Sequence, residues 1–121
     1  MKLPYESQLL RIFVGESDRL HGKLLYEAIV EKARESGMAG ATVLHGVMGF
    51  GAHSRMHTSH VLRLSEDLPV VIEIVDKPER VESFLPILDI MVDEGLVTLE
   101  NVKVIAYRHG TAPVDSEPTS A

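Results

Sequence analysis

The residues best suited to chemistry lie in one glycine-rich segment, residues 46–51, and in the polar residues that follow it. The segment reads Gly-Val-Met-Gly-Phe-Gly, and His53, Ser54 and Arg55 come next. Glycine lets backbone N–H groups approach an anion closely, and an arginine adds charge-assisted hydrogen bonds. The spacing fits neither a Walker A loop nor a dinucleotide-binding fingerprint, because no Gly-Lys-Ser/Thr ending and no helix follow. A phosphate site and a plain flexible loop therefore both remain open.

Histidines in the same stretch suggest a second chemistry, metal binding. His53, His57 and His60 are spaced so that a helix would place their imidazoles on one side. The preceding glycines oppose a helix, and residues 49–60 contain no Asp or Glu that could orient the rings. Solvated loop histidines are the plainer interpretation, and a metal site formed by these three residues is the alternative.

An acidic cluster, Glu16, Ser17 and Asp18, follows the first expected strand. Residues of these types are common in turns and at helix caps, and this role suits them better than acid–base catalysis. No Ser/His/Asp order, pair of catalytic carboxylates or nucleophile elbow stands out in the sequence. We therefore expect a protein that is not an enzyme.

Composition excludes several other classes of protein. The chain has 121 residues, of which 45% are hydrophobic and 25% charged, as expected of one globular domain. It carries 12 Lys and Arg against 18 Asp and Glu, a net charge of −6 that argues against a nucleic-acid partner. The absence of cysteine excludes disulfides and thiol chemistry. Without a signal-peptide pattern or a long apolar run, the expected location is cytoplasmic.

Hydrophobic periodicity predicts the element order β-α-β-β-α-β. The strands are expected at residues 8–15, 41–48, 68–76 and 97–107, and a loop at residues 49–60. The helices are expected at residues 22–36, capped by Gly37, and from Pro78 to a second cap at Gly95. Two right-handed βαβ units give an α+β, ferredoxin-like sandwich, with a four-stranded antiparallel sheet and both helices on one face. Residues 1–109 form this single domain, and residues 110–121 a mobile tail.

The sheet face away from the helices is expected to be unusually apolar. Strand alternation places several large side chains there: Phe13, Val71, Val75, Ile105 and Tyr107, mixed with Arg11, Glu73 and Lys103. A solvated face is mostly polar, so we expect this one to be covered by other copies of the chain.

Two stretches resemble the PII signal-transduction proteins. Residues 37–43, Gly-Met-Ala-Gly-Ala-Thr-Val, match a similar G-x-x-G-x-T-V stretch of those proteins. Gly49-Phe50-Gly51 matches the G-F-G that opens their long T-loop. The span of residues 10–105 resembles still more closely a PII-like family catalogued as domain of unknown function 190. Four passages carry that likeness: residues 14–18, 25–30, 49–51 and 64–70.

The resemblance implies a ferredoxin-like homotrimer that binds an adenine nucleotide in clefts between subunits and needs no cofactor. The nucleotide would control the T-loop-like segment at residues 49–60, and a membrane transporter or channel is the suggested protein partner. By their positions in the PII pattern, the nucleotide-binding candidates are Thr42, Gly49, Phe50 and Gly51. His53, Ser54 and Arg55 are weaker candidates, because they lie only near the basic and amide residues that follow G-F-G in PII proteins. Arg108, near the end of the last expected strand, is a further candidate.

Two departures from the PII pattern limit what the resemblance implies. Residues 93–97, Asp-Glu-Gly-Leu-Val, stand where PII proteins have a glycine-rich phosphate loop with a lysine, so AMP or ADP suits the chain better than a triphosphate. Residues 49–60 contain no tyrosine that could be uridylylated. The alternatives are a metal-binding trimer of the CutA type, through the three loop histidines, and a purely structural trimer that binds partners.

Overall fold

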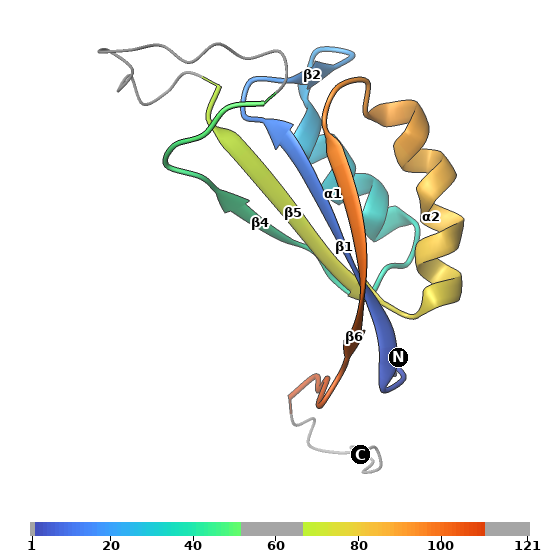
Figure 1. Ribbon diagram of the computed structural model, residues 1–121. Coiled ribbons are helices and arrows are strands. Elements are labelled where there is room, and N and C mark those ends of the chain that lie inside the picture. Colours follow the sequence, from blue (N-terminus) through green and yellow to red (C-terminus); the bar gives the residue numbers. More distant parts are fainter. Residues whose placement is uncertain (1, 52–66, 111–121) are drawn as a thin grey trace.

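The computed structural model describes residues 2–51 and 67–110. Within them, one four-stranded antiparallel sheet in the order β4-β5-β1-β6 supports two helices, and a two-stranded hairpin stands apart (Figure 1). The elements follow one another along the chain as β1 Glu6–Gly15, β2 Arg19–Leu20, β3 Lys23–Leu24, α1 Leu25–Glu35, β4 Thr42–His45, β5 Pro69–Asp76, α2 Pro78–Met91 and β6 Leu96–Lys103. The α+β, ferredoxin-like fold expected from the sequence is therefore confirmed.

The hydrophobic core lies between the sheet and the helices. Alternate residues of β1 and β5 are fully buried, as the period of two in a strand requires; they include Leu10, Ile12, Ile72 and Ile74. The helices contribute Ile29 from α1 and Phe84 and Leu88 from α2 to the same cluster. Burial of this apolar surface holds the two layers together. In the described part of the chain, no helix is long and apolar enough to cross a membrane.

The end of α1 forms as the sequence predicts. Gly37 adopts the left-handed conformation with φ +79°. Its N–H donates to the carbonyl of Arg34, and the N–H of Met38 donates to the carbonyl of Ala33. These two bonds are a Schellman motif, which satisfies carbonyls at the helix end and favours glycine at this position.

The end of α2 differs from the prediction that Gly95 caps it. The helix stops at Met91, and Val92 is its C-cap. Gly95 instead lies in the turn that leads to β6, with φ +154°. A Cβ at this position would lie 2.7 Å from the carbonyl oxygen of Phe13, so the turn requires glycine because the two backbones approach each other closely.

The boundaries of three other elements differ from the prediction by three residues or more. α1 begins at Leu25 rather than residue 22, because residues 19–24 form the β2–β3 hairpin. β4 spans only Thr42–His45 of the expected strand at residues 41–48. β6 ends at Lys103, which pairs with Glu6, the first residue of β1. Beyond this point no length of β1 remains to pair with residues 105–107.

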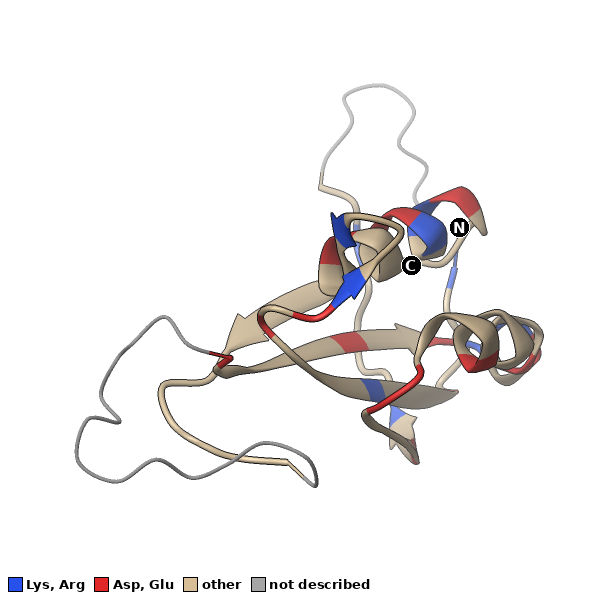
Figure 2. Ribbon diagram, turned by 90° about the horizontal axis from the view of Figure 1, so that it is seen from above, with Lys and Arg blue, Asp and Glu red and all other residues tan. Residues whose placement is uncertain are grey.

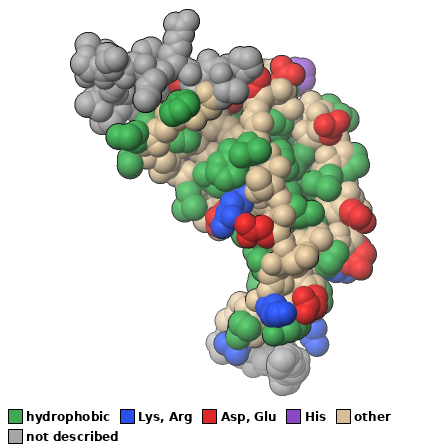
Figure 3. Space-filling model, viewed as in Figure 1, with side chains coloured by type: hydrophobic (Ala, Val, Ile, Leu, Met, Phe, Trp, Pro, Cys, Tyr) green, Lys and Arg blue, Asp and Glu red, His purple; other side chains and the backbone are tan. Residues whose placement is uncertain are grey.

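The helix-free face of the sheet contains most of the residues expected there. Cross-strand pairing aligns one apolar row over all four strands: Leu44, Val71, Phe13 and Leu96. The next row is polar, and Arg11 in it contacts Glu73 at 2.9 Å and Glu100 at 3.3 Å. The hydrogen bond to Glu73 raises the pKa of Arg11. Figure 3 shows hydrophobic side chains gathered on this face beside a cluster of basic and acidic ones.

Three residues expected on the helix-free face are not there. In β6 the residues that share a face with Phe13 and Arg11 are Leu96 and Thr98, so the odd-numbered residues of β6 have the opposite orientation. Lys103 belongs to this odd-numbered set. Ile105 lies beyond the strand and is 83% exposed, while the Tyr107 hydroxyl donates to the carbonyl of Ala39. The prediction was wrong here because it set the last strand too far along the chain.

Candidate functional site

The glycine-rich segment leaves β4 at the end of the sheet where β5 begins. The N–H of Gly46 donates to the carbonyl of Pro69 at 2.7 Å. A Cβ on Gly46 would lie 2.7 Å from Cγ of Pro69, and one on Gly49 would lie 3.0 Å from the same atom. Gly49 also has φ +158°. Both glycines therefore let the chain pack on the Pro69 ring. This packing explains the two glycines structurally, without any role in binding a ligand.

Large apolar side chains of this segment point into solvent. Val47 is 87% exposed, Met48 79% and Phe50 68%. Gly49 and Gly51 are exposed as well. Single exposed hydrophobic residues are ordinary, but three within four positions are unusual on the surface of a monomer. The segment is therefore accessible to a ligand or a partner.

The chain re-enters the described fold at the same corner of the molecule. Asp67 adopts a left-handed conformation with φ +48°, and its Oδ1 accepts a hydrogen bond from the Ser17 hydroxyl at 2.9 Å. The N–H of Glu16 donates to the carbonyl of Leu68. A Cβ on Gly15 would lie 2.3 Å from Asp67 Oδ1, so a larger residue here would displace the Asp67 side chain from its bond with Ser17. The chain therefore leaves the sheet through Gly46 and Gly49 and returns through Asp67 and Leu68, both beside the end of the sheet where β5 begins (Figure 1).

The acidic cluster after β1 forms a turn, as the sequence indicates. Asp18 Oδ2 accepts a hydrogen bond from the N–H of Gly15 at 2.9 Å, and the N–H of Asp18 donates to the carbonyl of the same glycine. The cluster does not cap α1, because the N-cap is Leu24 and makes no side-chain cap bond. The Asp18 carboxylate and the Ser17 hydroxyl are therefore both used in holding the chain at this turn.

Two nucleotide-binding candidates lie away from the glycine-rich segment. Thr42, the first residue of β4, is exposed and pairs with Glu73, four residues along β5 from Pro69. Arg108 adjoins Tyr107, whose hydroxyl reaches Ala39, and Ala39 in turn donates to Asp76 at the far end of β5. From Pro69 to Asp76 the strand rises by about 23 Å, at roughly 3.3 Å per residue. Within one chain, Arg108 and Gly49–Gly51 therefore lie at opposite ends of the sheet.

His53, Ser54, Arg55, His57 and His60 lie outside the described residues. Among the residues that the structure describes, no group of three His, Asp or Glu side chains could hold a metal ion. His45, at the end of β4, packs edge-on against Tyr26 with 5.3 Å between ring centroids. Its Nδ1 lies 3.8 Å from the Glu16 carboxylate.

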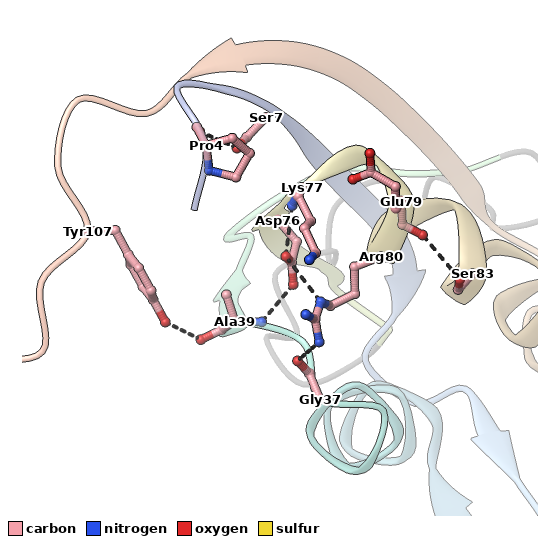
Figure 4. Close-up of polar contacts among 10 residues, drawn as sticks. All are labelled: Pro4, Ser7, Gly37, Ala39, Asp76, Lys77, Glu79, Arg80, Ser83 and Tyr107. Carbon is pink, nitrogen blue, oxygen red and sulfur yellow. Dashed lines mark hydrogen bonds and ion pairs between the residues drawn. The ribbon is translucent and has the colours of Figure 1, made fainter. Parts of the chain in front are cut away.

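Sequence reasoning missed a buried polar network at the opposite end of the sheet (Figure 4). The Asp76 side chain is completely buried, and its oxygens accept hydrogen bonds from the N–H groups of Ala39 and Lys77. Arg80 lies 3.5 Å from the Asp76 carboxylate and donates to the carbonyl of Gly37. This network joins β5, α2 and the connection between α1 and β4. The sequence did contain a signal for this network. Asp76 continues the alternation of buried residues along β5 and directly precedes Lys77 and Pro78, so a buried carboxylate could have been expected there.

The fold is that of the PII-like proteins. The structure is similar to a PII-like signaling protein of Thermus thermophilus, with a TM-score of 0.59 and 22% identity over 86% of this chain and 93% of that one. It is also similar to CPII of Thiomonas intermedia K12 bound to ADP and bicarbonate, with a TM-score of 0.56 and 21% identity over 83% and 89% of the two chains. A second structure of CPII, bound to ADP, AMP and bicarbonate, has a TM-score of 0.54 and 18% identity over 86% and 98%.

Sequence comparison identifies the family to which the chain belongs. Residues 7–104 match the family model of domain of unknown function 190, described as "Uncharacterized ACR". A UPF0166 protein of Aquifex aeolicus is 38% identical over 83% of this chain and 94% of its own length. A UPF0166 protein of Methanocaldococcus jannaschii is 33% identical over 82% and 92%. The chain belongs to this family of PII-like proteins, as its sequence motifs indicated.

Proposed function

We propose that this protein is a regulator that binds an adenine nucleotide, AMP or ADP, and transmits its presence to a partner protein. The observation that carries this proposal is the accessible Gly49–Gly51 backbone at the corner where the T-loop-like segment leaves the sheet. Glycine has no side chain, so its backbone lets N–H groups approach a phosphate closely. CPII, which shares the fold, has been crystallised with ADP and AMP. The proposed role is binding rather than catalysis.

We place the nucleotide between copies of the chain in a homotrimer. Arg108 and Gly49–Gly51 lie at opposite ends of one sheet, so a single chain does not bring them to one phosphate. Thr42 is exposed on the edge strand between these ends. A cleft between two subunits could join the glycines of one copy to Arg108 of another. The apolar row of the helix-free face supplies a surface for such an assembly.

The local charge favours a mono- or diphosphate over a triphosphate. The turn between α2 and β6 contains Asp93 and Glu94 rather than a lysine, and this connection is red in Figure 2. Acidic side chains repel phosphates, and each additional phosphate needs further cationic or N–H partners. Arg55 is the only Lys or Arg within residues 49–60.

Replacing Arg55 by alanine is expected to weaken binding of the preferred nucleotide tenfold to a hundredfold. Loss of a charge-assisted contact to phosphate costs about 1.5–3 kcal/mol, which corresponds to this change in the dissociation constant. Isothermal titration calorimetry with AMP, ADP and ATP measures it. Arg34→Ala, on the last turn of α1, removes the same charge elsewhere and should leave the affinity unchanged. Equal affinities for Arg55→Ala and the unaltered protein would exclude Arg55 from the site and make Arg108 the next residue to replace.

The second step of the proposal is that nucleotide binding changes the conformation of residues 49–60, which a partner then recognises. A membrane transporter or channel is the partner class to test first. A ligand shifts a conformational equilibrium only through different affinities for the two states. Hydrogen exchange of these residues should therefore slow with saturating AMP or ADP, while that of β1 stays constant. Unchanged exchange in residues 49–60, with binding proved by calorimetry, would contradict the signalling step but not nucleotide binding.

A further inference from the structure

The chain leaves the sheet shortly before Arg108. The N–H of Val104 donates to the carbonyl of Tyr5 at 2.8 Å, one residue beyond the end of β6. Ile105 follows and is 83% exposed. No residue of 104–108 belongs to the hydrophobic core that the described residues form. Packing on the core therefore does not determine where this segment lies.

One side chain of the segment reaches back to the rest of the fold. The Tyr107 hydroxyl donates to the carbonyl of Ala39 at 2.9 Å (Figure 4). Ala39 lies in the connection between α1 and β4, sixty-eight residues earlier in the chain. Tyr107 is half-buried, although Ala106 and Arg108 on either side of it are exposed. This hydrogen bond therefore joins the segment that ends in Arg108 to the α1–β4 connection.

The residue that accepts this bond is itself held in place. The N–H of Ala39 donates to Asp76 Oδ2 at 2.8 Å, and the Asp76 side chain is completely buried. Two residues earlier, the carbonyl of Gly37 accepts a hydrogen bond from Arg80 at 2.8 Å. Ala39 is thus bonded through both its N–H and its carbonyl. A carbonyl fixed in this way is a rigid point of attachment for Tyr107, and rigid supporting contacts keep a binding group in place.

The same contact links the segments that carry two of the nucleotide-binding candidates. Arg108 directly follows Tyr107, and Thr42 is the third residue after Ala39. Three residues of extended chain span at most about 11 Å. Both candidates are exposed. The hydrogen bond therefore joins, within one chain, the backbone on which Arg108 is carried to the backbone on which Thr42 is carried.

We propose that Tyr107 is a positioning residue of the nucleotide site: its hydroxyl, bonded to Ala39, holds Arg108 where the guanidinium binds a phosphate of AMP or ADP. The inference rests on the proposed function, in which Arg108 of one copy completes the cleft at Gly49–Gly51 of another. An arginine on an untethered segment loses backbone and side-chain entropy when it binds. Because the hydroxyl fixes the segment beforehand, it lowers this cost and raises the affinity without touching the nucleotide.

Tyr107→Phe removes the hydroxyl and keeps the ring, so it tests this contact. Isothermal titration calorimetry should show AMP and ADP binding about three- to tenfold weaker than in the unaltered protein, since one hydrogen bond of ordinary net strength is lost. Tyr5→Phe is the matched control. It removes a hydroxyl from a ring that is 55% exposed at the same end of the sheet, so it should leave the affinity unchanged.

A double-mutant cycle with Arg108→Ala separates positioning from general support of the fold. Arg108→Ala alone should weaken binding tenfold to a hundredfold, because a charge-assisted contact is lost. Since Tyr107 acts through Arg108, adding Tyr107→Phe to Arg108→Ala should change the affinity no further. A hydroxyl that only stabilised the fold would weaken binding by the same factor in both backgrounds.

Backbone ¹⁵N relaxation, measured by NMR without nucleotide, tests the attachment of the segment directly. The amides of Ile105 and Arg108 should become more mobile on the picosecond-to-nanosecond timescale in Tyr107→Phe. The same amides should be unchanged in Tyr5→Phe, and those of β1 should remain rigid in both variants.

Three results would overturn the inference while nucleotide binding stands. The first is equal affinity of Tyr107→Phe and the unaltered protein. The second is an equal loss of affinity from Tyr107→Phe with and without Arg108→Ala. The third is unchanged mobility of residues 105–108 in Tyr107→Phe. An unaltered protein that binds neither AMP nor ADP would instead contradict the proposed function, and the role of Arg108 with it.

Discussion

Asp76→Ala is expected to lower the free energy of unfolding by about 3–5 kcal/mol, because it removes a buried carboxylate that holds two backbone N–H groups and faces a partly exposed guanidinium. The Asp76 carboxylate is completely buried and accepts hydrogen bonds of 2.8 Å from Ala39 and 2.7 Å from Lys77. It also lies 3.5 Å from the Arg80 guanidinium, whose Nε is buried. Alanine would leave two N–H groups and a positive charge without these partners. Urea denaturation followed by circular dichroism measures the change.

The position of Asp76 makes its loss more disruptive than that of an ordinary surface carboxylate. Asp89→Ala, at an exposed position of α2, is the control and should change the free energy of unfolding by less than about 0.5 kcal/mol. Asp76→Asn keeps one acceptor oxygen and the size of the side chain, so its effect should fall between the two. If Asp76→Ala were as stable as Asp89→Ala, the network of Figure 4 would contribute little to the fold.

Val71→Asp is expected to convert the proposed trimer to a monomer at micromolar concentration. Val71 lies in the middle of the apolar row on the helix-free face, between Leu44 and Phe13. An aspartate there would bury an unpaired charge at the contact between subunits, at a cost of about 3–5 kcal/mol. Multi-angle light scattering gives the molecular mass of both proteins.

The control for Val71→Asp is Ile90→Asp, on α2. Ile90 is 83% exposed and lies on the helix side of the sheet, so this variant should remain a trimer. Circular dichroism of both variants shows whether the monomer is folded. A monomeric unaltered protein, or a trimeric Val71→Asp variant, would contradict assembly through this face.

Periodicity and turn chemistry were enough to predict the fold. Leu25, Ile29 and Ala33 recur at helical spacing and are all buried on α1, and the residues of β5 alternate between buried and half-buried positions. Gly37 ends α1 in a left-handed conformation, which glycine adopts readily. The end of this helix could therefore be predicted from the sequence. Such features depend on neighbours in the chain and can be recognised without tertiary contacts.

Features that depend on contacts between distant residues could not be predicted from the sequence. The end of β6 is set by where β1 begins, so the prediction for Ile105 and Tyr107 was wrong. Gly95 is required by the Phe13 carbonyl, which is eighty-two residues earlier in the chain, rather than by α2. Of the candidate nucleotide site, the sequence located the glycine-rich segment through its composition. It did not indicate that Arg108 lies at the other end of the sheet from that segment.

The corner at Pro69 also has a consequence for how the family can vary. Gly46 on one side and Asp67 on the other hold the two ends of the intervening chain next to each other, through contacts that do not involve residues 52–66. Closing a loop whose ends are already adjacent becomes only about 0.6 kcal/mol more costly for each doubling of its length. Insertions, deletions and wholesale replacement between these two anchors are therefore thermodynamically cheap. The same fold can therefore accept many different segments between Gly46 and Asp67. Binding specificity can change through this segment while the residues of the hydrophobic core remain constrained by their packing.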